Sequence, residues 1–202
     1  MRRWPRIHVG LQPSGLLAVI LALGVVLTLL AGSHTDPLSG RPVNNFLNSH
    51  TLMQTATDAS FFAIMAVGAT AVIIAGGIDL SVGSIYALCG VLTAMLLRAV
   101  PSAGGGTAFL LGLTACLGIG LLAGLANGLM VVGLRVHPFI ITLGTMWIFR
   151  GIAFVASTAE SILLPAPLTA GVKAGLGLAP GLYPVPLLVM LAVTAVGAAY
   201  LS

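Results

Sequence analysis

The sequence predicts an all-α polytopic membrane protein with about six transmembrane helices, and two observations carry this prediction. Hydrophobic residues make up 58% of the 202 residues, whereas charged residues make up only 6%. Soluble proteins are about one quarter charged. The apolar runs are also long and unbroken, which suits helices rather than the alternating strands of a membrane barrel. We therefore expect a single membrane domain over residues 1–202, with lipid as its solvent.

Six apolar stretches come close to the roughly 20 residues that a helix needs to cross a bilayer. They cover residues 14–32, 55–75, 80–97, 108–134, 138–156 and 187–201. The polar stretch 33–54 contains turn-forming pairs, and the proline-rich stretch 157–186 is expected to be an external loop. Arg2, Arg3 and Arg6 precede the first apolar stretch, and this basic cluster predicts a cytoplasmic N-terminus.

A charged residue lies in a predicted helix break over residues 76–84, between the second and third apolar stretches. An ionised Asp79 would cost about 2.5–3.5 kcal/mol in the middle of a bilayer. Nearby glycines let the backbone turn, so Asp79 can accept hydrogen bonds from N–H groups at the start of the next helix. Ser81 and Ser84 add hydroxyl groups there. Two interpretations remain open, namely a broken helix that lines a polar pathway and a tight interfacial turn capped by Asp79.

The fourth apolar stretch carries small residues at every fourth position, which are Cys116, Gly120, Gly124 and Gly128. This spacing predicts that another helix packs closely against this face. Asn127 lies beside the small residues, and a buried amide needs hydrogen-bond partners. Those partners are either another helix or water in a pathway.

The fifth apolar stretch contains three further polar residues. Thr142 and Thr145 are candidates for a pathway, although their hydroxyl groups can also bond back to carbonyls of their own helix. Arg150 lies well inside the apolar run, so it must pair with an acid, extend to the membrane surface or face water.

Several kinds of chemistry have no support in the sequence. We find no phosphate-binding loop, no paired carboxylates, no nucleophile next to a base and no zinc motif. We therefore expect no catalytic residues, no metal and no cofactor, and the chain is not predicted to be an enzyme. The net charge of +4 comes without a basic patch with interleaved aromatic residues, so nucleic-acid binding is not expected.

Taken in order, these motifs resemble the permease subunits of bacterial ABC importers for monosaccharides, of the ribose, xylose, arabinose and galactose type, with autoinducer-2 relatives. The resemblance runs from about Thr51 to the end of the chain. Its motifs are Gly76-Gly77-Ile78-Asp79-Leu80-Ser81-Val82-Gly83-Ser84, Asn127-Gly128, Pro138-Phe139-Ile140, Thr142-Leu143-Gly144, Arg150-Gly151, Leu164-Pro165 and Tyr183-Pro184-Val185-Pro186. Together these motifs are specific, whereas each alone would be weak.

The resemblance implies a permease that moves a monosaccharide or similar small polar solute inward across the bacterial cytoplasmic membrane. It implies three protein partners, which are a cytoplasmic ABC ATPase, an extracytoplasmic sugar-binding protein and a second permease subunit in a homo- or heterodimer. ATP hydrolysis would take place on the ATPase chain.

The chain departs from the family pattern after its sixth apolar stretch. The resemblance implies that residues 1–202 are the N-terminal two thirds of a permease domain, without the ATPase-coupling region and the later helices. Two other functions therefore remain open. One is a secondary transporter or facilitator that uses no ATPase, and the other is an inactive, truncated permease remnant.

Overall fold

The structure is a computed structural model that describes residues 12–36, 40–100, 105–164 and 185–201. It divides into two compact units, unit 1 (Met1–Thr55) and unit 2 (Ala56–Ser202). The predicted basic cluster near the N-terminus and most of the predicted external loop lie outside the described residues.

Unit 1 contains one apolar helix and a short hairpin that the sequence did not predict. Helix α1 (Gln12–Leu30) is followed by strands β1 (Ser33–Thr35) and β2 (Pro42–Asn44), which pair antiparallel. The side chain of Asn44 joins the hairpin to the helix, because its Nδ2 donates to the carbonyl of Thr28 at 2.8 Å. Its Oδ1 accepts from the backbone N–H groups of Phe46 and Leu47. Strands of three residues without apolar alternation leave little signal in a sequence.

Helix α2 (Ser49–Ile74) begins in unit 1 and continues into unit 2. It starts six residues before the predicted boundary at Thr55. The reason is local, because Asn48 caps the helix with a side-chain oxygen that accepts from the backbone N–H of Thr51 at 2.8 Å. The prediction followed hydropathy and therefore missed the polar first turns of this helix.

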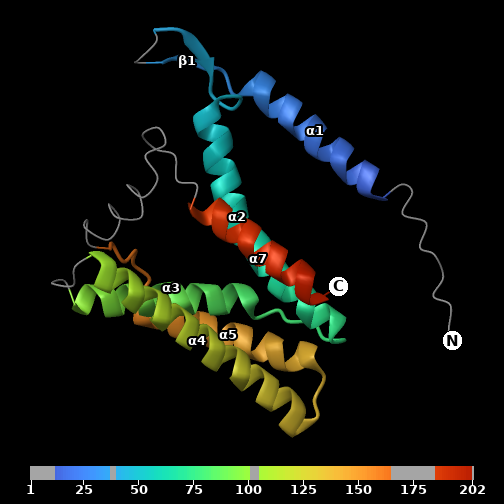
Figure 1. The fold of residues 1–202 in the computed structure, drawn as a ribbon, viewed down its shortest axis with the longest axis vertical. Helices are drawn as coiled ribbons and strands as arrows, with labels where there is room; N and C mark the ends of the chain where they lie inside the picture. The colour runs from blue at the N-terminus through green and yellow to red at the C-terminus, as the bar shows by residue number, and fades with distance from the viewer. Residues whose placement is uncertain (1–11, 37–39, 101–104, 165–184, 202) are drawn as a thin grey trace. The chain divides into compact units, whose positions relative to one another are not determined.

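Unit 2 is built on three helices, α3 (Val82–Ala99), α4 (Gly105–Leu134) and α5 (Pro138–Ala156). Helix α3 packs against both α4 and α5, and α4 also contacts α5 (Figure 1). Helix α5 has the predicted bounds, with Pro138 in its first turn and His137 as its N-cap. The last described helix is α7 (Val185–Leu201), which begins two residues before the predicted stretch 187–201.

The interior of unit 2 is made of small and polar side chains. The buried apolar residues are Leu88, Leu97, Ala108, Ala123 and Ala153, and the buried polar residues are Ser60, Ser81, Ser84, Thr93, Asn127, Thr142 and Thr145. Large apolar side chains are instead exposed along the helices. This distribution is typical of membrane helices, which approach one another through small residues and share hydrogen bonds.

Close approaches between helices agree with that pattern. A Cβ atom added at Gly112 on α4 would lie 3.3 Å from Cδ1 of Leu97 on α3. Phe61 on α2 and Tyr86 on α3 form a tilted ring pair with centroids 6.4 Å apart. Glycine at position 112 therefore allows α4 to lie directly against α3.

Four described helices are long and apolar enough to cross a membrane, namely α2, α3, α4 and α5. The apolar parts of α1 and α7 within the described residues, Ser14–Leu30 and Pro186–Tyr200, are shorter. The predicted all-α polytopic membrane fold is confirmed, with the β1–β2 hairpin as a small addition.

Candidate functional site at the break between two helices

The chain leaves helical geometry between α2 and α3, in a short segment that we call the break (residues 75–81). Gly76 has a φ of +82°, in the left-handed region that glycine adopts without steric cost. The predicted break over residues 76–84 included the first turn of the next helix, and in the structure that helix begins at Val82. The carbonyl of Ser81 accepts from the N–H groups of Ser84 and Ile85, so the first turn of α3 already includes Ser84.

Asp79 binds the residue at the N-cap position of α3. Its Oδ1 accepts from the backbone N–H of Ser81 at 2.7 Å and from the hydroxyl group of Ser81 at 2.6 Å. The sequence predicted that Asp79 would accept from exposed N–H groups at the start of the next helix. In the structure the only such group that it accepts from, among the described residues, is the N–H of the N-cap residue Ser81, whose own side chain makes no cap bond.

Ser81 connects Asp79 to helix α4. The Nδ2 of Asn127 donates to the hydroxyl oxygen of Ser81 at 2.7 Å, and both residues are buried. Because the single hydroxyl hydrogen of Ser81 goes to the carboxylate, Ser81 can only accept from Asn127. The bond to Ser81 therefore fixes the orientation of the Asn127 amide, with its Oδ1 directed away from Ser81. That oxygen has no hydrogen-bond partner among the described residues.

Thr142 connects the break to helix α5. Its Oγ1 accepts from the backbone N–H of Leu80 at 3.2 Å and donates to the carbonyl of Ile78 at 3.1 Å. One threonine thus satisfies two backbone groups that have lost their helical partners. Its predicted bond back to its own helix is long, at 3.4 Å to the carbonyl of Phe139. Among the described residues, the hydroxyl group of Thr145 bonds only within α5, to the carbonyl of Thr142 at 3.3 Å.

A cavity of about 340 Å³ opens beside these residues, and we call it the break cavity. Its walls come from the end of α2, the break, the second half of α4 and the start of α5. Gly124 and Gly128 line it, and a Cβ atom added at either would meet nothing within 4 Å. Gly120 lies against α3 instead, with Cys89 Sγ 3.7 Å from an added Cβ atom. Among the three predicted packing glycines, only Gly120 therefore faces a neighbouring helix closely.

The structure brings together four of the six predicted pathway residues, Asp79, Ser81, Asn127 and Thr142. Ser84 and Thr145 are buried but do not line the break cavity. Arg150 is exposed on α5 and forms no ion pair with Asp79 in the described structure. Within the described ranges, no group of three or more His, Cys, Asp or Glu side chains could hold a metal ion.

Sequence reasoning missed the parts of the site that carry no polar side chain. Val72, Val131 and Pro138 form apolar walls of the break cavity, and their residue types do not distinguish them from other helix residues. The backbone contacts of Thr142 with Ile78 and Leu80 were also missed, because they join segments more than 60 positions apart.

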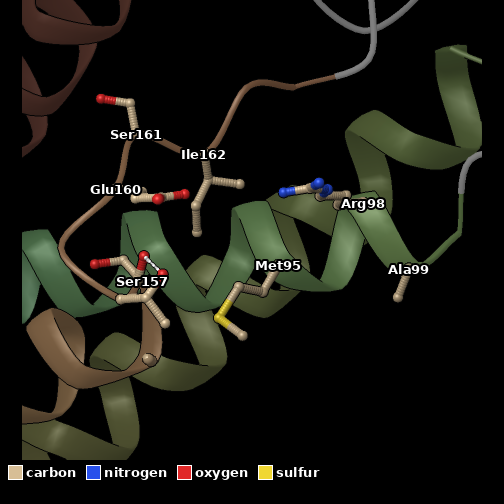
Figure 2. Close-up of a pocket in the computed structure, with 9 residues that line it drawn as sticks. Met95, Arg98, Ala99, Ser157, Glu160, Ser161 and Ile162 are labelled. Carbon is tan, nitrogen blue, oxygen red and sulfur yellow. Dashed lines mark hydrogen bonds between the residues drawn. The ribbon is translucent and has the colours of Figure 1, made fainter.

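A second cavity of about 350 Å³ lies at the other end of α3 and α5. It is lined by Met95 and Arg98 from α3, and by Ser157 and Glu160 from the turn after α5. Figure 2 shows Arg98 and Glu160 on opposite sides of Ile162. Because the break lies at the start of α3 and Arg98 in its last turn, the two cavities open at opposite ends of the same helices.

Residues 51–195 match the protein family described as "Branched-chain amino acid transport system / permease component". The chain is 37% identical over 137 residues to the autoinducer 2 import system permease protein LsrC of Escherichia coli, covering 64% of this chain and 38% of that protein. It is 40% identical over 117 residues to the D-allose transport system permease protein AlsC of Escherichia coli, covering 58% of this chain and 34% of that protein.

A third relative is the inner membrane ABC transporter permease protein YjfF of Escherichia coli, which is 37% identical over 123 residues, covering 61% of this chain and 35% of that protein. The chain thus spans little more than a third of the length of the curated relatives it matches. No solved structure matches it.

Proposed function

This chain belongs to the family of permease components described for branched-chain amino acid transport systems, and from that premise we propose that it forms part of an ATP-driven importer. In this proposal the chain is a membrane-spanning permease that moves a monosaccharide or similar small polar solute inward across the bacterial cytoplasmic membrane. The relatives are named for the import of autoinducer 2 and the transport of D-allose, which supports a small polar solute.

The observation that carries the proposal is the break cavity, which has three polar side chains in its largely apolar wall, inside an apolar helical unit. Irregular backbone at membrane depth is tolerated where protein covers it or where it lines an aqueous cavity. Broken helices commonly form the solute sites of transporters for this reason. Here Asp79, Asn127 and Thr142 come from three different segments and line one cavity. Ser81 is buried and hydrogen-bonds to both Asp79 and Asn127.

The same proposal assigns partners and orientation. A cytoplasmic ABC ATPase would supply the energy, an extracytoplasmic sugar-binding protein would deliver the solute, and a second permease subunit would complete the pathway. The N-terminus would be cytoplasmic, as the cluster of Arg2, Arg3 and Arg6 favours. The chain itself would act as a transport subunit and not as an enzyme.

The test begins with co-purification in detergent of the tagged chain and the ATPase subunit encoded beside it. We expect a stable complex, and radiolabelled monosaccharide uptake in proteoliposomes that contain the chain and its partner subunits. The matched control is an ATPase variant that binds but does not hydrolyse ATP, with which uptake should stop. Uptake that proceeds equally fast with this variant would contradict an ATP-driven importer and favour a facilitator.

A further inference from the structure

The second cavity, which we call the charged cavity, has two opposite charges in its wall that do not pair with each other. Arg98 comes from the last turn of α3 and Glu160 from the turn after α5. Figure 2 shows the guanidinium group of Arg98 and the carboxylate of Glu160 directed toward one another, with Ile162 between them. Among the described residues, neither side chain forms an ion pair or a hydrogen bond. Both charged groups are therefore available to a ligand.

The charged cavity lies at one surface of the membrane. Helices α3 and α5 have 18 and 19 residues, close to the roughly 20 that a helix needs to cross a bilayer. Because the cavity lies where both helices end, a spanning helix pair holds it at the level of the lipid headgroups. Phe154 and Val155, in the last turn of α5, are exposed apolar residues next to the cavity. Lipid chains can cover this apolar surface while their headgroups reach the charges.

The two charges favour a ligand that carries both a phosphate and an ammonium group. A phosphate pairs with Arg98 through charge-assisted hydrogen bonds, and an ammonium pairs with Glu160 in the same way. Ser157 and Ser161 add hydroxyl groups to the wall. The negative ends of the α3 and α5 dipoles also favour the ammonium. An anionic headgroup would be attracted by Arg98 but repelled by Glu160, so a zwitterion fits better.

The wall of the cavity also favours a primary ammonium over a quaternary one. Proteins hold quaternary ammonium ligands in cages of aromatic side chains. None of the described residues that line the charged cavity is aromatic. A primary ammonium has three N–H donors, which the carboxylate and hydroxyl oxygens can accept. Phosphatidylethanolamine joins such an ammonium to its phosphate through a short ethylene spacer.

The turn that carries Glu160 has an uncommon backbone conformation. Thr158 and Ala159 have φ values of 52° and 58°, in the left-handed region that non-glycine residues rarely adopt. The N–H of Ala159 donates to the carbonyl of Phe154, and the N–H of Glu160 donates to the carbonyl of Ser157. Such conformations persist where the surrounding structure holds them, and they cluster at ligand-binding sites. This turn keeps Glu160 beside the cavity.

We propose that the charged cavity binds the headgroup of a zwitterionic phospholipid with a primary ammonium, such as phosphatidylethanolamine. Arg98 pairs with the phosphate, and Glu160 accepts hydrogen bonds from the ammonium. The volume of about 350 Å³ lies within the roughly 300–1,000 Å³ range of small-molecule sites. Met95 and Ile162 offer apolar surface to the glycerol backbone of the lipid. The site needs only the membrane fold and holds whichever solute the permease moves.

The test measures lipid binding to the full chain, purified in detergent without any ATPase, by native mass spectrometry. The chain is titrated with phosphatidylethanolamine, its N,N-dimethyl derivative, phosphatidylcholine and phosphatidylglycerol, all with the same acyl chains. We expect phosphatidylethanolamine to reach half occupancy at the lowest concentration. Phosphatidylcholine should need about fivefold more, because its ammonium has no N–H to donate. The dimethyl lipid should lie between the two.

Two charge variants test the residues. Arg98→Gln and Glu160→Gln should each raise the concentration of phosphatidylethanolamine at half occupancy about fivefold. Glu160→Gln should also bind phosphatidylglycerol more tightly than the unsubstituted chain does, because the repelling charge is gone. Arg135→Gln is the matched control, since Arg135 is also exposed at a helix end but does not line the charged cavity. If a variant does not fold, the lipid series with the unsubstituted chain still decides the question.

Four results would overturn the inference. Equal binding of phosphatidylethanolamine and phosphatidylcholine would remove the role of the primary ammonium. Tightest binding of phosphatidylglycerol would identify a site for anionic lipid instead. Release of the lipid by an equal concentration of soluble glycerophosphoethanolamine would identify a free zwitterion as the ligand. An effect of Arg135→Gln as large as that of Arg98→Gln would show only a general attraction of phospholipid to basic side chains.

Discussion

The side-chain amide of Asn127 donates a 2.7 Å hydrogen bond to the hydroxyl group of Ser81, which lies 46 positions earlier in the chain. This bond joins the last third of α4 to the N-cap of α3, and the hydroxyl group of Ser81 donates a hydrogen bond to Asp79. A buried serine thereby couples a carboxylate in the break to an amide on α4.

Ser81→Ala should destabilise the chain, because it leaves the buried amide of Asn127 without an acceptor and removes a donor to Asp79. The loss of a buried partner costs about 1–3 kcal/mol. Thermal unfolding in detergent measures the effect. The matched control is Ser157→Ala, since that hydroxyl group bonds only to the carbonyl of Phe154 within the same turn. Equal changes in unfolding temperature for the two variants would contradict a stabilising role of the hydrogen bonds of Ser81.

Thr142→Val should loosen the break, because valine has nearly the shape of threonine but cannot bond to Leu80 or Ile78. We expect faster amide hydrogen exchange at Leu80, measured by mass spectrometry of peptides that cover the break. Thr142→Ser keeps the hydroxyl group and should retain most of the protection. Thr145→Val is a second control, as its hydroxyl group bonds only within α5. Unchanged exchange in Thr142→Val would refute the bridging role.

Gly76→Ala should be destabilising by about 1–2 kcal/mol, the cost of holding a non-glycine residue in left-handed geometry. Space is not the reason, because an added Cβ atom at Gly76 would meet nothing within 4 Å. Gly68→Ala, in the interior of α2, is equally open and should instead stabilise the helix by up to about 1 kcal/mol. Melting temperatures in detergent should therefore move in opposite directions, and a shift in the same direction would contradict this explanation.

Asn44→Ala should release the end of α1 from the hairpin in unit 1. The asparagine joins them by donating to the carbonyl of Thr28 and by accepting from the N–H groups of Phe46 and Leu47. Asn44→Asp keeps the acceptor and removes only the donor, so its effect should be smaller. The release is measured by the rate of limited proteolysis in the segment between β1 and α2. Cleavage that is no faster in Asn44→Ala than in the unsubstituted chain would argue against this anchoring.

The sequence predicted the helices well because hydropathy and chain breakers depend on residue type alone. Pro138 marked the start of α5 correctly, and the glycines before Asp79 marked a real break. Asp79, Ser81 and Asn127 were recognised as polar residues in apolar surroundings. Their mutual hydrogen bonds were not predicted, because they depend on how α3 and α4 pack over distances that local patterns do not encode.

Two further features illustrate the same limit. Gly120, Gly124 and Gly128 have identical spacing, yet only the first lies closely against a neighbouring helix, whereas the other two line the break cavity. The predicted break and the predicted third helix overlapped over residues 80–84, and residue types alone did not separate them. The backbone bond from Ser84 to Ser81, which puts it in helix α3, follows from geometry and not from composition.

The unequal lengths of two packed helices have a consequence for the surrounding lipid. Helix α4 has 30 residues and α3 has 18, so their lengths are about 45 Å and about 27 Å. A hydrocarbon layer about 30 Å thick matches the shorter helix and forces the longer one to tilt. Bilayer thickness would therefore set the tilt of α4, and α3 would tilt with it, because the two helices are joined both at Gly112 and by the hydrogen bond between Ser81 and Asn127.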